Sequence, residues 1–412
     1  MKLHLSKPTT NLISAVIAIT GSKSETNRLL LLQALFANIK LKNLSNSDDA
    51  EVMKKGLMVS NGEVDIHHAG TAMRFLTSYF AASDGKEVVL TGSARMKERP
   101  IKILVDALNS LGAHISYLEN QGFPPLKISG RKLTASEVEL PANISSQYIS
   151  SLMLIAPSLE NGLTIKLLGK ITSVPYIEMT LGLLNQIGVA TNFKENTIHI
   201  QPLTNAVDAT IVVESDWSAA SYFYSLVAMA EKGSAITLTS YKKDSLQGDS
   251  ALVEIYKNFG VSTEFAAHAI ILKKVQNQLM DQLNLDLANA PDIAQTIAVT
   301  CFGLGLGCHL TGLHTLPIKE TDRLAAMKTE LEKVGASVAI GPDNLSLAKG
   351  GQVIGGATID TYNDHRMAMA FAPLCLKTNL SINDAGVVSK SYPDFWEDLK
   401  KVGLVIKHEG EN

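Results

Sequence analysis

Residues 104–112 read LVDALNSLG, and segments of the same kind return along the whole chain. In each copy, apolar residues recur at helical spacing, a glycine follows where a left-handed helix end belongs, and a β-prone stretch comes next. The other copies are residues 181–188 (LGLLNQIG), 252–260 (LVEIYKNFG), 324–335 (LAAMKTELEKVG) and 395–403 (FWEDLKKVG), with a weaker copy at 52–62 (VMKKGLMVSNG). Each copy predicts a helix that ends at glycine and leads into a strand.

The spacing of these glycines indicates an α/β protein built from about six units. Glycines 62, 112, 188, 260, 335 and 403 follow one another at intervals of 50, 76, 72, 75 and 68 residues. Solenoid repeats are usually about 20 to 50 residues long, so β–α units of about 70 residues fit better. Helix ends of this kind also occur in α/β proteins without internal repeats. The regular intervals favour true repeats, with three units on each side of about residue 214.

The composition excludes some classes of protein. The 412 residues include 37 basic and 40 acidic side chains, the net charge is −3, and only 6% of residues are aromatic. A nucleic-acid surface needs a basic field and stacking rings, so we expect no nucleic-acid partner. Cys301, Cys308 and Cys375 stand in apolar stretches, which is typical of reduced, buried thiols in a cytoplasmic protein.

Two apolar stretches resemble membrane or export signals only superficially. Residues 293–318 contain no Asp, Glu, Lys or Arg, but glycines 303, 305 and 307 interrupt them. We expect a buried helix, a glycine turn and a strand there, and no membrane span. Residues 12–20 are short and β-prone and lack a small-residue cleavage site, so we expect a buried strand and no leader peptide.

Short polar motifs separate the predicted units, and most of them lead into a predicted helix. They are residues 21–28 (GSKSETNR), 69–74 (AGTAMR), 95–100 (RMKERP), 145–148 (SSQY), 290–292 (APD), 319–323 (KETDR), 361–366 (TYNDHR) and 389–394 (SKSYPD). Each motif alone is equally explained as a helix cap or a solvated turn. Together they place cations near helix starts in both halves: Lys23, Arg28, Arg74, Arg99, Lys319, Arg323, Arg366 and Lys390. Since helix N-termini favour anions, the pattern predicts a cleft between two domains for a ligand with several anionic groups.

Two residues in these motifs bear on catalysis and cofactors. Asp292 is an isolated carboxylate at a predicted helix start, so it is either a favourable first-turn residue or a candidate base. His365 has no second His or Cys beside it at metal-ligand spacing. We therefore expect neither a metal nor another cofactor.

The motifs, taken in order, resemble those of the 5-enolpyruvylshikimate-3-phosphate (EPSP) synthase family of enolpyruvyl transferases. GSKSxxNR, KETDR and NDHRMAM in one chain are a specific combination, and SVPY (residues 173–176) and PDxAxTIA (residues 291–298) also match. The resemblance covers essentially the whole chain. It implies an α/β fold of two similar domains, each of three βαβαββ units, with the chain crossing twice between them. Residues 1–20 and 215–412 would form the domain of the phosphoenolpyruvate side and the catalytic acids, and residues 21–214 the inserted, shikimate-3-phosphate domain.

By the same resemblance, the enolpyruvyl group of phosphoenolpyruvate is transferred to the 5-hydroxyl of shikimate 3-phosphate, and phosphate leaves through a tetrahedral intermediate. Such chemistry needs a base, an acid and cations for the phosphates and carboxylates. The implied catalytic residues are Asp292 as the base, with Glu320 and Lys23 for proton transfer at the methylene carbon. The shikimate-3-phosphate set is Lys23, Ser24, Arg28, Ser145, Ser146, Gln147, Ser173, Tyr176, Asp292, Thr315 and Lys319. The phosphoenolpyruvate set is Lys23, Gly70, Arg99, Gln147, Arg323, Arg366 and Lys390.

The chain departs from the family pattern at three positions. His68 stands where Asn is common, so its contact with substrate is only a tentative expectation. Phe75 replaces a usual Pro, and Thr315 replaces a frequent Asn. Gly70 is the residue of glyphosate-sensitive members, so the resemblance implies that glyphosate inhibits this chain.

Two alternatives stay open beside this interpretation. An enolpyruvyl transferase acting on UDP-N-acetylglucosamine has similar repeats, but it reads Lys-Asn where this chain has Lys23-Ser24 and usually has a Cys near residues 95–100. A non-catalytic anion-binding protein would have lost Asp292, Glu320 or Lys390, which are all present. We expect a cytoplasmic monomer whose partners are its two small anionic substrates.

Overall fold

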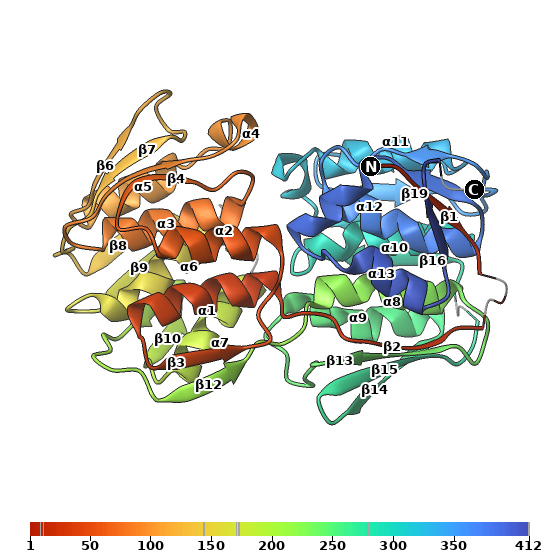
Figure 1. The fold of residues 1–412 in the computed structure, drawn as a ribbon, viewed down its shortest axis with the longest axis horizontal. Coiled ribbons are helices and arrows are strands. Elements are labelled where there is room, and N and C mark those ends of the chain that lie inside the picture. Colours follow the sequence, from red (N-terminus) through yellow and green to blue (C-terminus); the bar gives the residue numbers. More distant parts are fainter. Residues whose placement is uncertain are drawn as a thin grey trace. The chain divides into compact units, whose positions relative to one another are not determined.

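The computed structural model describes residues 1–8, 10, 12–142, 145–169, 171, 174–277 and 280–410. The chain forms two compact units (Figure 1). We name the continuous segment Gly21–Val213 the inserted unit. Met1–Thr20 and Glu214–Asn412 together form the split unit.

The inserted unit alternates helices with short strands. Its helices are α1 (Lys23–Leu35), α2 (Asp48–Leu57), α3 (Gly70–Ala81), α4 (Ala94–Lys97), α5 (Lys102–Ser110), α6 (Ser146–Ile155), the 3₁₀ turn η1 (Ala156–Ser158) and α7 (Val174–Gln186). Its strands are β3 (Ile39–Lys42), β4 (Asn61–Asp65), β5 (Glu87–Thr91), β6 (His114–Tyr117), β7 (Leu126–Ser129), β8 (Glu137–Pro141), β9 (Leu163–Leu168), β10 (Thr191–Lys194), β11 (Thr197–Ile200) and β12 (Ala209–Val212). They form sheets in the orders β4-β5-β7-β6, β10-β11-β9-β8 and β12-β3.

The split unit follows the same scheme. Its helical elements are α8 (Trp217–Met229), η2 (Gly248–Ala251), α9 (Leu252–Ile255), η3 (Tyr256–Phe259), η4 (Pro291–Ile293), α10 (Ala294–Gly303), η5 (Leu316–Ile318), α11 (Arg323–Lys333), α12 (His365–Phe371), η6 (Ala372–Leu376), η7 (Ala385–Lys390) and α13 (Phe395–Lys401). Its strands are β1 (Leu3–Ser6), β2 (Ser14–Ile17), β13 (Ala235–Thr239), β14 (Val261–Ala266), β15 (Ala269–Lys274), β16 (Gln282–Asp286), β17 (Gly307–Thr311), β18 (Val338–Ile340), β19 (Leu345–Leu347), β20 (Thr358–Ile359), β21 (Leu380–Ile382) and β22 (Val405–His408). The sheets run β14-β15-β13-β2, β16-β17-β19-β18 and β20-β21-β1-β22.

Each four-stranded sheet among the described residues has one parallel and two antiparallel pairs. In the inserted unit, β4 runs parallel to β5, whereas β7 is antiparallel to both β5 and β6. In the split unit, β16 runs parallel to β17, and β19 is antiparallel to β17 and β18. This is the pairing that a βαβαββ unit produces. The predicted α/β class is therefore confirmed. The unit of α1, β3 and α2 differs, because its sheet contains only β3 and β12 among the described strands.

The predicted helix ends follow the chemistry of glycine. Five of the six marked glycines, at positions 112, 188, 260, 335 and 403, lie just after a helix with φ between +74° and +105°. Only glycine adopts this left-handed backbone without strain, so it ends each helix and turns the chain toward a strand. The weaker sixth copy was wrong in detail, since α2 ends at Leu57 and Gly62 lies inside β4.

The helices form the interior of each unit, and the sheets lie around them (Figure 1). In α3, every residue except Thr71 is buried, and α8 is buried along almost its whole length. A helix that is buried on all sides must carry mostly apolar or small residues on all faces, as both sequences do, with Arg74 of α3 as a buried charge. The strands show the complementary alternation, with Val88 and Leu90 of β5 facing inward.

The two apolar stretches fold as short helices, turns and strands. Residues 293–318 contain α10, a turn with Gly305 at φ +72°, and β17, as predicted. Residues 12–20 contain β2, but the expected burial is wrong for Val16, which is 68% exposed on this edge strand. Within the described part of the chain, no helix has the length and apolar character to cross a bilayer.

Candidate active site

The first candidate group lies at the start of α1 in the inserted unit. Ser22 occupies the N-cap position but its side chain accepts no hydrogen bond from the helix, whereas Ser47 caps α2 by accepting from the Ala50 N–H at 3.3 Å. Lys23, the first residue of α1, places Nζ 3.3 Å from Asp49 Oδ2. A lysine at a helix start without a side-chain cap favours an anionic ligand.

Arg28 lies one turn further along α1, inside the helix packing. Its Nε donates to Thr180 Oγ1 of α7 at 2.8 Å, and Nη2 donates to Ser150 Oγ of α6 at 3.1 Å. Nη1 bonds the Ser24 carbonyl at 2.8 Å. Burial lowers the pKa of Arg28 to about 10, since these direct partners are neutral oxygens. A buried guanidinium without a carboxylate hydrogen-bonded to it among the described residues suits an anion supplied from outside.

A second group gathers at the start of α3. Gly70 is the first residue of this helix, and Ala69 at the N-cap position offers no side-chain acceptor. A Cβ at Gly70 would lie 2.5 Å from Arg99 Nη1, so the guanidinium lies against the bare glycine. Gln147 Nε2 donates to Thr71 Oγ1 at 3.1 Å. The structure thus brings together Gly70, Arg99 and Gln147, all predicted for the phosphoenolpyruvate set.

Arg74 connects the two segments that carry Gly70 and Arg99. Its Nη1 donates to the Gly70 carbonyl and its Nη2 to the Pro100 carbonyl, both at 3.2 Å. Tyr148 OH donates to the same Pro100 carbonyl at 2.5 Å. Burial, and then repulsion from Arg99, lowers the pKa of Arg74 to about 10. Two guanidinium groups held this close make the start of α3 strongly electropositive.

The remaining predicted residues of the inserted unit lie at helix ends. Ser145 caps α6 by accepting from the Gln147 N–H at 3.4 Å. The interpretation of this motif as a helix cap is therefore confirmed. Ser146 is buried at the first position of α6. Tyr176 lies in the first turn of α7, where its carbonyl accepts from Thr180. His68 Nδ1 lies 2.8 Å from Ser93 Oγ. Ser173 lies outside the described residues.

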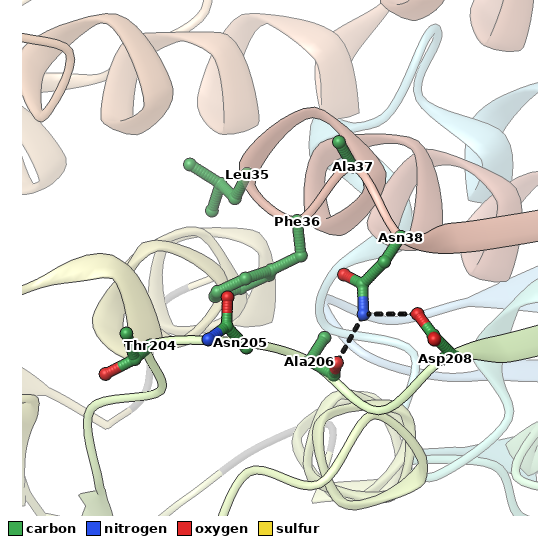
Figure 2. A pocket seen from close by; sticks show the side chains of 8 residues that line it. All are labelled: Leu35, Phe36, Ala37, Asn38, Thr204, Asn205, Ala206 and Asp208. Atoms are coloured by element: carbon green, nitrogen blue, oxygen red, sulfur yellow. Dashed lines mark hydrogen bonds between the residues drawn. The ribbon is translucent and has the colours of Figure 1, made fainter.

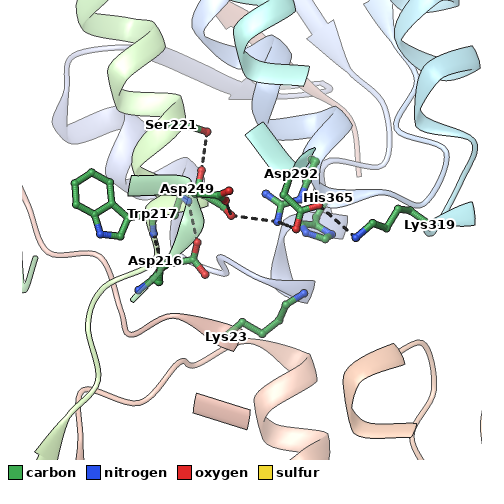
Figure 3. Close-up of polar contacts among 12 residues, drawn as sticks. Lys23, Asp216, Trp217, Ser221, Asp249, Asp292, Lys319 and His365 are labelled. Atoms are coloured by element: carbon green, nitrogen blue, oxygen red, sulfur yellow. Dashed lines mark hydrogen bonds and ion pairs between the residues drawn. The ribbon is translucent and has the colours of Figure 1, made fainter. Parts of the chain in front are cut away.

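In the split unit, cations from two helices and the segment before α11 converge on Asp292 in η4. Arg323 Nη1 lies 3.0 Å from Oδ1, Arg366 Nη2 lies 3.0 Å from Oδ2, and Lys319 Nζ lies 3.5 Å from Oδ1. Figure 3 shows Lys319 reaching Asp292 from one side. The carboxylate is 13% exposed, so the pairs are only weakly screened by water. Three predicted site residues and the predicted base therefore meet at one point.

Arg323 is the most enclosed of these cations. It donates from Nε to Asp364 Oδ2 at 2.7 Å and from Nη2 to Glu320 Oε2 at 2.9 Å. Burial alone would lower the pKa of Arg323, but Asp364, Glu320 and Asp292 together raise it above its ordinary value. The pKa of Arg366 is raised in the same way: burial lowers it, but Asp292 and other neighbours together outweigh burial. Arg323 and Arg366 are thus neutralised by acids of their own unit, whereas Arg28 and Arg74 donate hydrogen bonds to neutral acceptors.

Two more predicted residues lie in this unit. Lys390, at the end of η7, donates to the Asn363 carbonyl at 2.5 Å, which attaches it to the segment before α12. Thr315 Oγ1 is buried and has no hydrogen-bond partner among the described residues. A buried hydroxyl without a partner is costly, so a ligand that bonds to it would be stabilised.

Comparisons with known proteins decide the family. The model of the family described as EPSP synthase (3-phosphoshikimate 1-carboxyvinyltransferase) matches residues 58–399. The 3-phosphoshikimate 1-carboxyvinyltransferase of Bacteroides fragilis (strain YCH46) is 45% identical over 412 residues, covering 99% of both chains. That of Aliivibrio salmonicida (strain LFI1238) is 37% identical over 423 residues, covering 95% of this chain and 97% of its own. The chain belongs to the EPSP synthase family.

Solved structures agree on the fold of this family. The EPSP synthase of Acinetobacter baumannii superposes with a TM-score of 0.80 at 20% identity, covering 99% of this chain and 100% of its own. The enolpyruvyl transferase NikO of Streptomyces tendae superposes with a TM-score of 0.75 at 12% identity, covering 99% and 98%. The predicted two-domain enolpyruvyl transferase fold is confirmed, and so are the family resemblance and the prediction that the chain is an enzyme.

Sequence reasoning missed several residues that form hydrogen bonds or ion pairs with the predicted site residues. Asp364 is the buried partner of Arg323, and Asp49 pairs with Lys23. Ser150 and Thr180 hold Arg28. Asp364 lies inside a quoted motif, and its position at the N-cap of α12, before Arg366, was an available signal. The others lie in helices without a distinguishing pattern.

A cavity and the arrangement of possible metal ligands also bear on the site. A cavity of about 540 Å³ lies in the inserted unit, where Asn38 donates to the Ala206 carbonyl and to Asp208 (Figure 2). No predicted site residue lines it. No group of three or more His, Cys, Asp or Glu side chains in the described ranges could hold a metal ion.

Proposed function

We propose that this chain transfers the enolpyruvyl group of phosphoenolpyruvate to the 5-hydroxyl of shikimate 3-phosphate and releases phosphate, a step of aromatic amino-acid biosynthesis. The observation that carries the proposal is the convergence of Lys319, Arg323 and Arg366 on Asp292 within 3.5 Å. Three cations around one carboxylate provide the positive charge that an anionic substrate needs beside a candidate base.

The proposed binding roles are those that the resemblance to the family implies. Lys23, Ser24, Arg28, Ser145, Ser146, Gln147, Ser173, Tyr176, Thr315 and Lys319 bind shikimate 3-phosphate, and His68 is a tentative addition. Lys23, Gly70, Arg99, Gln147, Arg323, Arg366 and Lys390 bind phosphoenolpyruvate. The lowered pKa values of Arg28 and Arg74 support an anion in the inserted unit, since an anion would repay the cost of burying these charges.

The proposed catalytic roles use the acids of the split unit. Asp292 takes the proton of the 5-hydroxyl as that oxygen attacks C2 of phosphoenolpyruvate, while Glu320 or Lys23 protonates C3. In the unliganded structure Asp292 is paired with three cations, which weakens it as a base. The carboxylate of phosphoenolpyruvate competes for Arg323 and Arg366, so substrate binding itself makes Asp292 more basic. Loss of phosphate, with removal of the C3 proton, then restores the double bond.

The decisive experiment measures phosphate release from phosphoenolpyruvate with and without shikimate 3-phosphate. We expect release only when both are present, and a fall of at least about 100-fold in kcat for Asp292→Asn, as for loss of a general base. Asp281→Asn is the matched control, because Asp281 is exposed and pairs with Lys349 at the surface. Phosphate release with UDP-N-acetylglucosamine in place of shikimate 3-phosphate, or no release with either acceptor, would overturn the proposal.

We further propose that the enzyme acts as a cytoplasmic monomer. Cys301, Cys308 and Cys375 are buried free thiols, which suits a reducing compartment. Light scattering during size-exclusion chromatography would measure the mass directly, against the 44.3 kDa of one chain.

A further inference from the structure

The segment of residues 245–250 (SLQGDS) is folded onto the first turn of α8. Gln247 makes the attachment: its Oε1 accepts from the Trp217 N–H at 2.9 Å, and its Nε2 donates to the Ser215 carbonyl at 3.0 Å. The Ser250 N–H closes a turn on the Gln247 carbonyl at 3.0 Å. These bonds fix the backbone on both sides of Asp249, so its side chain has a defined position against α8.

Asp249 is the start of a chain of hydrogen bonds that ends at Asp292. Ser218 Oγ donates to Asp249 Oδ2 and accepts from Arg366 Nη2 at 3.3 Å. The same Nη2 atom donates to Asp292 Oδ2 at 3.0 Å. Figure 3 shows Asp249 and Asp292 in this network of dashed contacts. Asp249 is only 7% exposed, so solvent contributes little to fixing its position.

We propose that Asp249 is a positioning residue of the active site: through Ser218 it holds the Arg366 guanidinium in place beside Asp292. This inference rests on the proposed roles of Arg366 in binding phosphoenolpyruvate and of Asp292 as the base. Without Asp249, Ser218 is free to rotate away, and Arg366 Nη2 then keeps its bond to Asp292 but loses the bond to Ser218. A guanidinium held from one side is less well placed to receive a substrate carboxylate.

Because Asp249 can lose its charge, we expect its effect on Arg366 to depend on pH. Burial, and then repulsion from Asp292, raises the pKa of Asp249 to about 7, whereas Arg366 and the Ser218 hydroxyl lower it. Asp216, at the N-cap of α8, is the other acid that faces it. When Asp249 is ionised it competes with the substrate for the positive charge of Arg366. It also disfavours the ionised form of Asp292, because repulsion between two carboxylates is reciprocal.

Three variants separate position from charge. Asp249→Ala and Ser218→Ala break the chain, and we expect each to raise the KM for phosphoenolpyruvate about tenfold, the usual effect of losing a hydrogen bond to a charged group. We expect kcat to fall less than KM rises. Asp249→Asn keeps an acceptor for Ser218, so it should recover most of the loss. Asp244→Asn, at an exposed carboxylate just before this segment, is the control and should match the wild type.

The dependence of the KM for phosphoenolpyruvate on pH tests the role of the Asp249 charge. In the wild type, the KM for phosphoenolpyruvate should rise as pH increases through 7, because ionised Asp249 then competes for Arg366. In Asp249→Asn this rise should be absent. Unchanged KM in both Asp249→Ala and Ser218→Ala, in an active and folded enzyme, would overturn the positioning role.

A measurement without catalysis keeps the test independent of the proposed function. The titration of Asp292 is followed by ¹³C NMR of its carboxyl carbon, assigned with Asp292→Asn. We expect Asp249→Asn to move this titration to lower pH, since it removes a neighbouring negative charge. If the wild type releases no phosphate, the proposed function fails alone. If the Asp292 titration is the same in the wild type, Asp249→Asn and Ser218→Ala, the positioning proposal fails whatever the activity.

Discussion

Arg323 and Asp364 form an ion pair that is closed to solvent: Nε lies 2.7 Å from Oδ2, and the two side chains are 2% and 0% exposed. Asp364 also caps α12 by accepting from the Arg366 N–H at 2.9 Å. One carboxylate therefore fixes two of the proposed substrate-binding arginines, the first by its charge and the second through the backbone. The pair connects the start of α11 with the start of α12.

The first prediction concerns the charge of Asp364. Asp364→Asn keeps the cap on α12 but removes the charge of the most deeply buried of the three carboxylates that pair with Arg323. We therefore expect a loss of about 1.5–3 kcal/mol in the free energy of unfolding of the split unit, the range for a hydrogen bond to a charged group. Asp360→Asn is the control, because Asp360 and its partner Lys333 are 48% and 34% exposed and their pair contributes about 0–1 kcal/mol.

Urea unfolding followed by tryptophan fluorescence measures this difference selectively. The chain has two tryptophans, and both Trp217 and Trp396 belong to the split unit. Equal urea midpoints for Asp364→Asn and Asp360→Asn would show that the buried charge pair is not needed for stability.

The second prediction separates binding from folding at Arg28. Arg28→Met removes a buried charge but keeps a side chain of similar length, and Ser150 Oγ and Thr180 Oγ1 can still bond each other at 3.0 Å. We expect stability to change by no more than about 1 kcal/mol, since replacing a buried charge by an apolar side chain is often neutral. The affinity for shikimate 3-phosphate should fall about 100-fold, through the loss of charge-assisted hydrogen bonds.

Calorimetry measures both quantities for Arg28→Met. Arg131→Met, at an exposed arginine of the same unit, should change neither. A variant that unfolds at much lower temperature, or that binds shikimate 3-phosphate as the wild type does, contradicts the prediction.

The third prediction uses the contact between Gly70 and Arg99. Because a Cβ at Gly70 would lie 2.5 Å from Arg99 Nη1, Gly70→Ala displaces the guanidinium. We expect the KM for phosphoenolpyruvate to rise about tenfold, which corresponds to a small overpacking cost. Gly70→Ala should leave the KM for shikimate 3-phosphate unchanged, and steady-state kinetics measure both values.

Glyphosate provides a second readout at the same position. We expect the wild type to be inhibited and Gly70→Ala to be less sensitive. Gly386→Ala is the control, since the nearest atom to its new Cβ lies 3.9 Å away. A wild-type enzyme that retains full activity in millimolar glyphosate would refute the expected sensitivity.

The fourth prediction concerns a buried lysine far from the proposed chemistry. Lys274 lies on the inward face of β15 with Ile270 and Leu272, and its Nζ donates to the carbonyls of Ala228 and Phe259 at 2.6 and 2.7 Å. Burial, and then repulsion from Lys377, lowers the pKa of Lys274 to about 8 from 10.5. Between these two values the unfolded chain holds a proton that the folded chain has lost, so stability rises with pH.

We therefore expect the free energy of unfolding to increase between pH 8 and 10.5 by up to about 1.4 kcal/mol per pH unit from this group. Lys274→Met should lack that contribution, although it leaves two carbonyls without a donor. Lys273→Met, at the exposed neighbour that pairs with Glu264, should keep the wild-type slope. Parallel slopes for all three proteins in urea unfolding would refute the prediction.

The parts of the fold that local chemistry decides could be predicted from the sequence. A glycine at a helix end needs no distant partner, so Gly112 and Gly335 could be identified from their own segments. The same holds for Asp322 before α11 and Asp364 before α12, which cap the helices that follow them. The motifs around Arg323 and Arg366 indicated a site because both arginines could be placed at helix starts from the sequence alone.

The remaining contacts depend on residues that only tertiary packing brings together. Thr180 lies 152 residues from Arg28, and Ser150 lies 122 residues away. Neither residue type indicates an arginine partner by itself. Asp249 was missed for the same reason, because its importance comes from Ser218 and Arg366 and not from its own segment. The division of roles between the two units stays a prediction.

The strand order of the split unit has a consequence for synthesis of the chain on the ribosome. β1 pairs with β21 and β22, so Leu3 lies opposite Ile382 and His408. β2 likewise needs β13, where Ala15 faces Ile236. β1 and β2 therefore have no partners while the inserted unit, which lies between them and those partners in the sequence, is translated. We expect the inserted unit to fold first, and the sheet around β1 to close only after β22 has been translated.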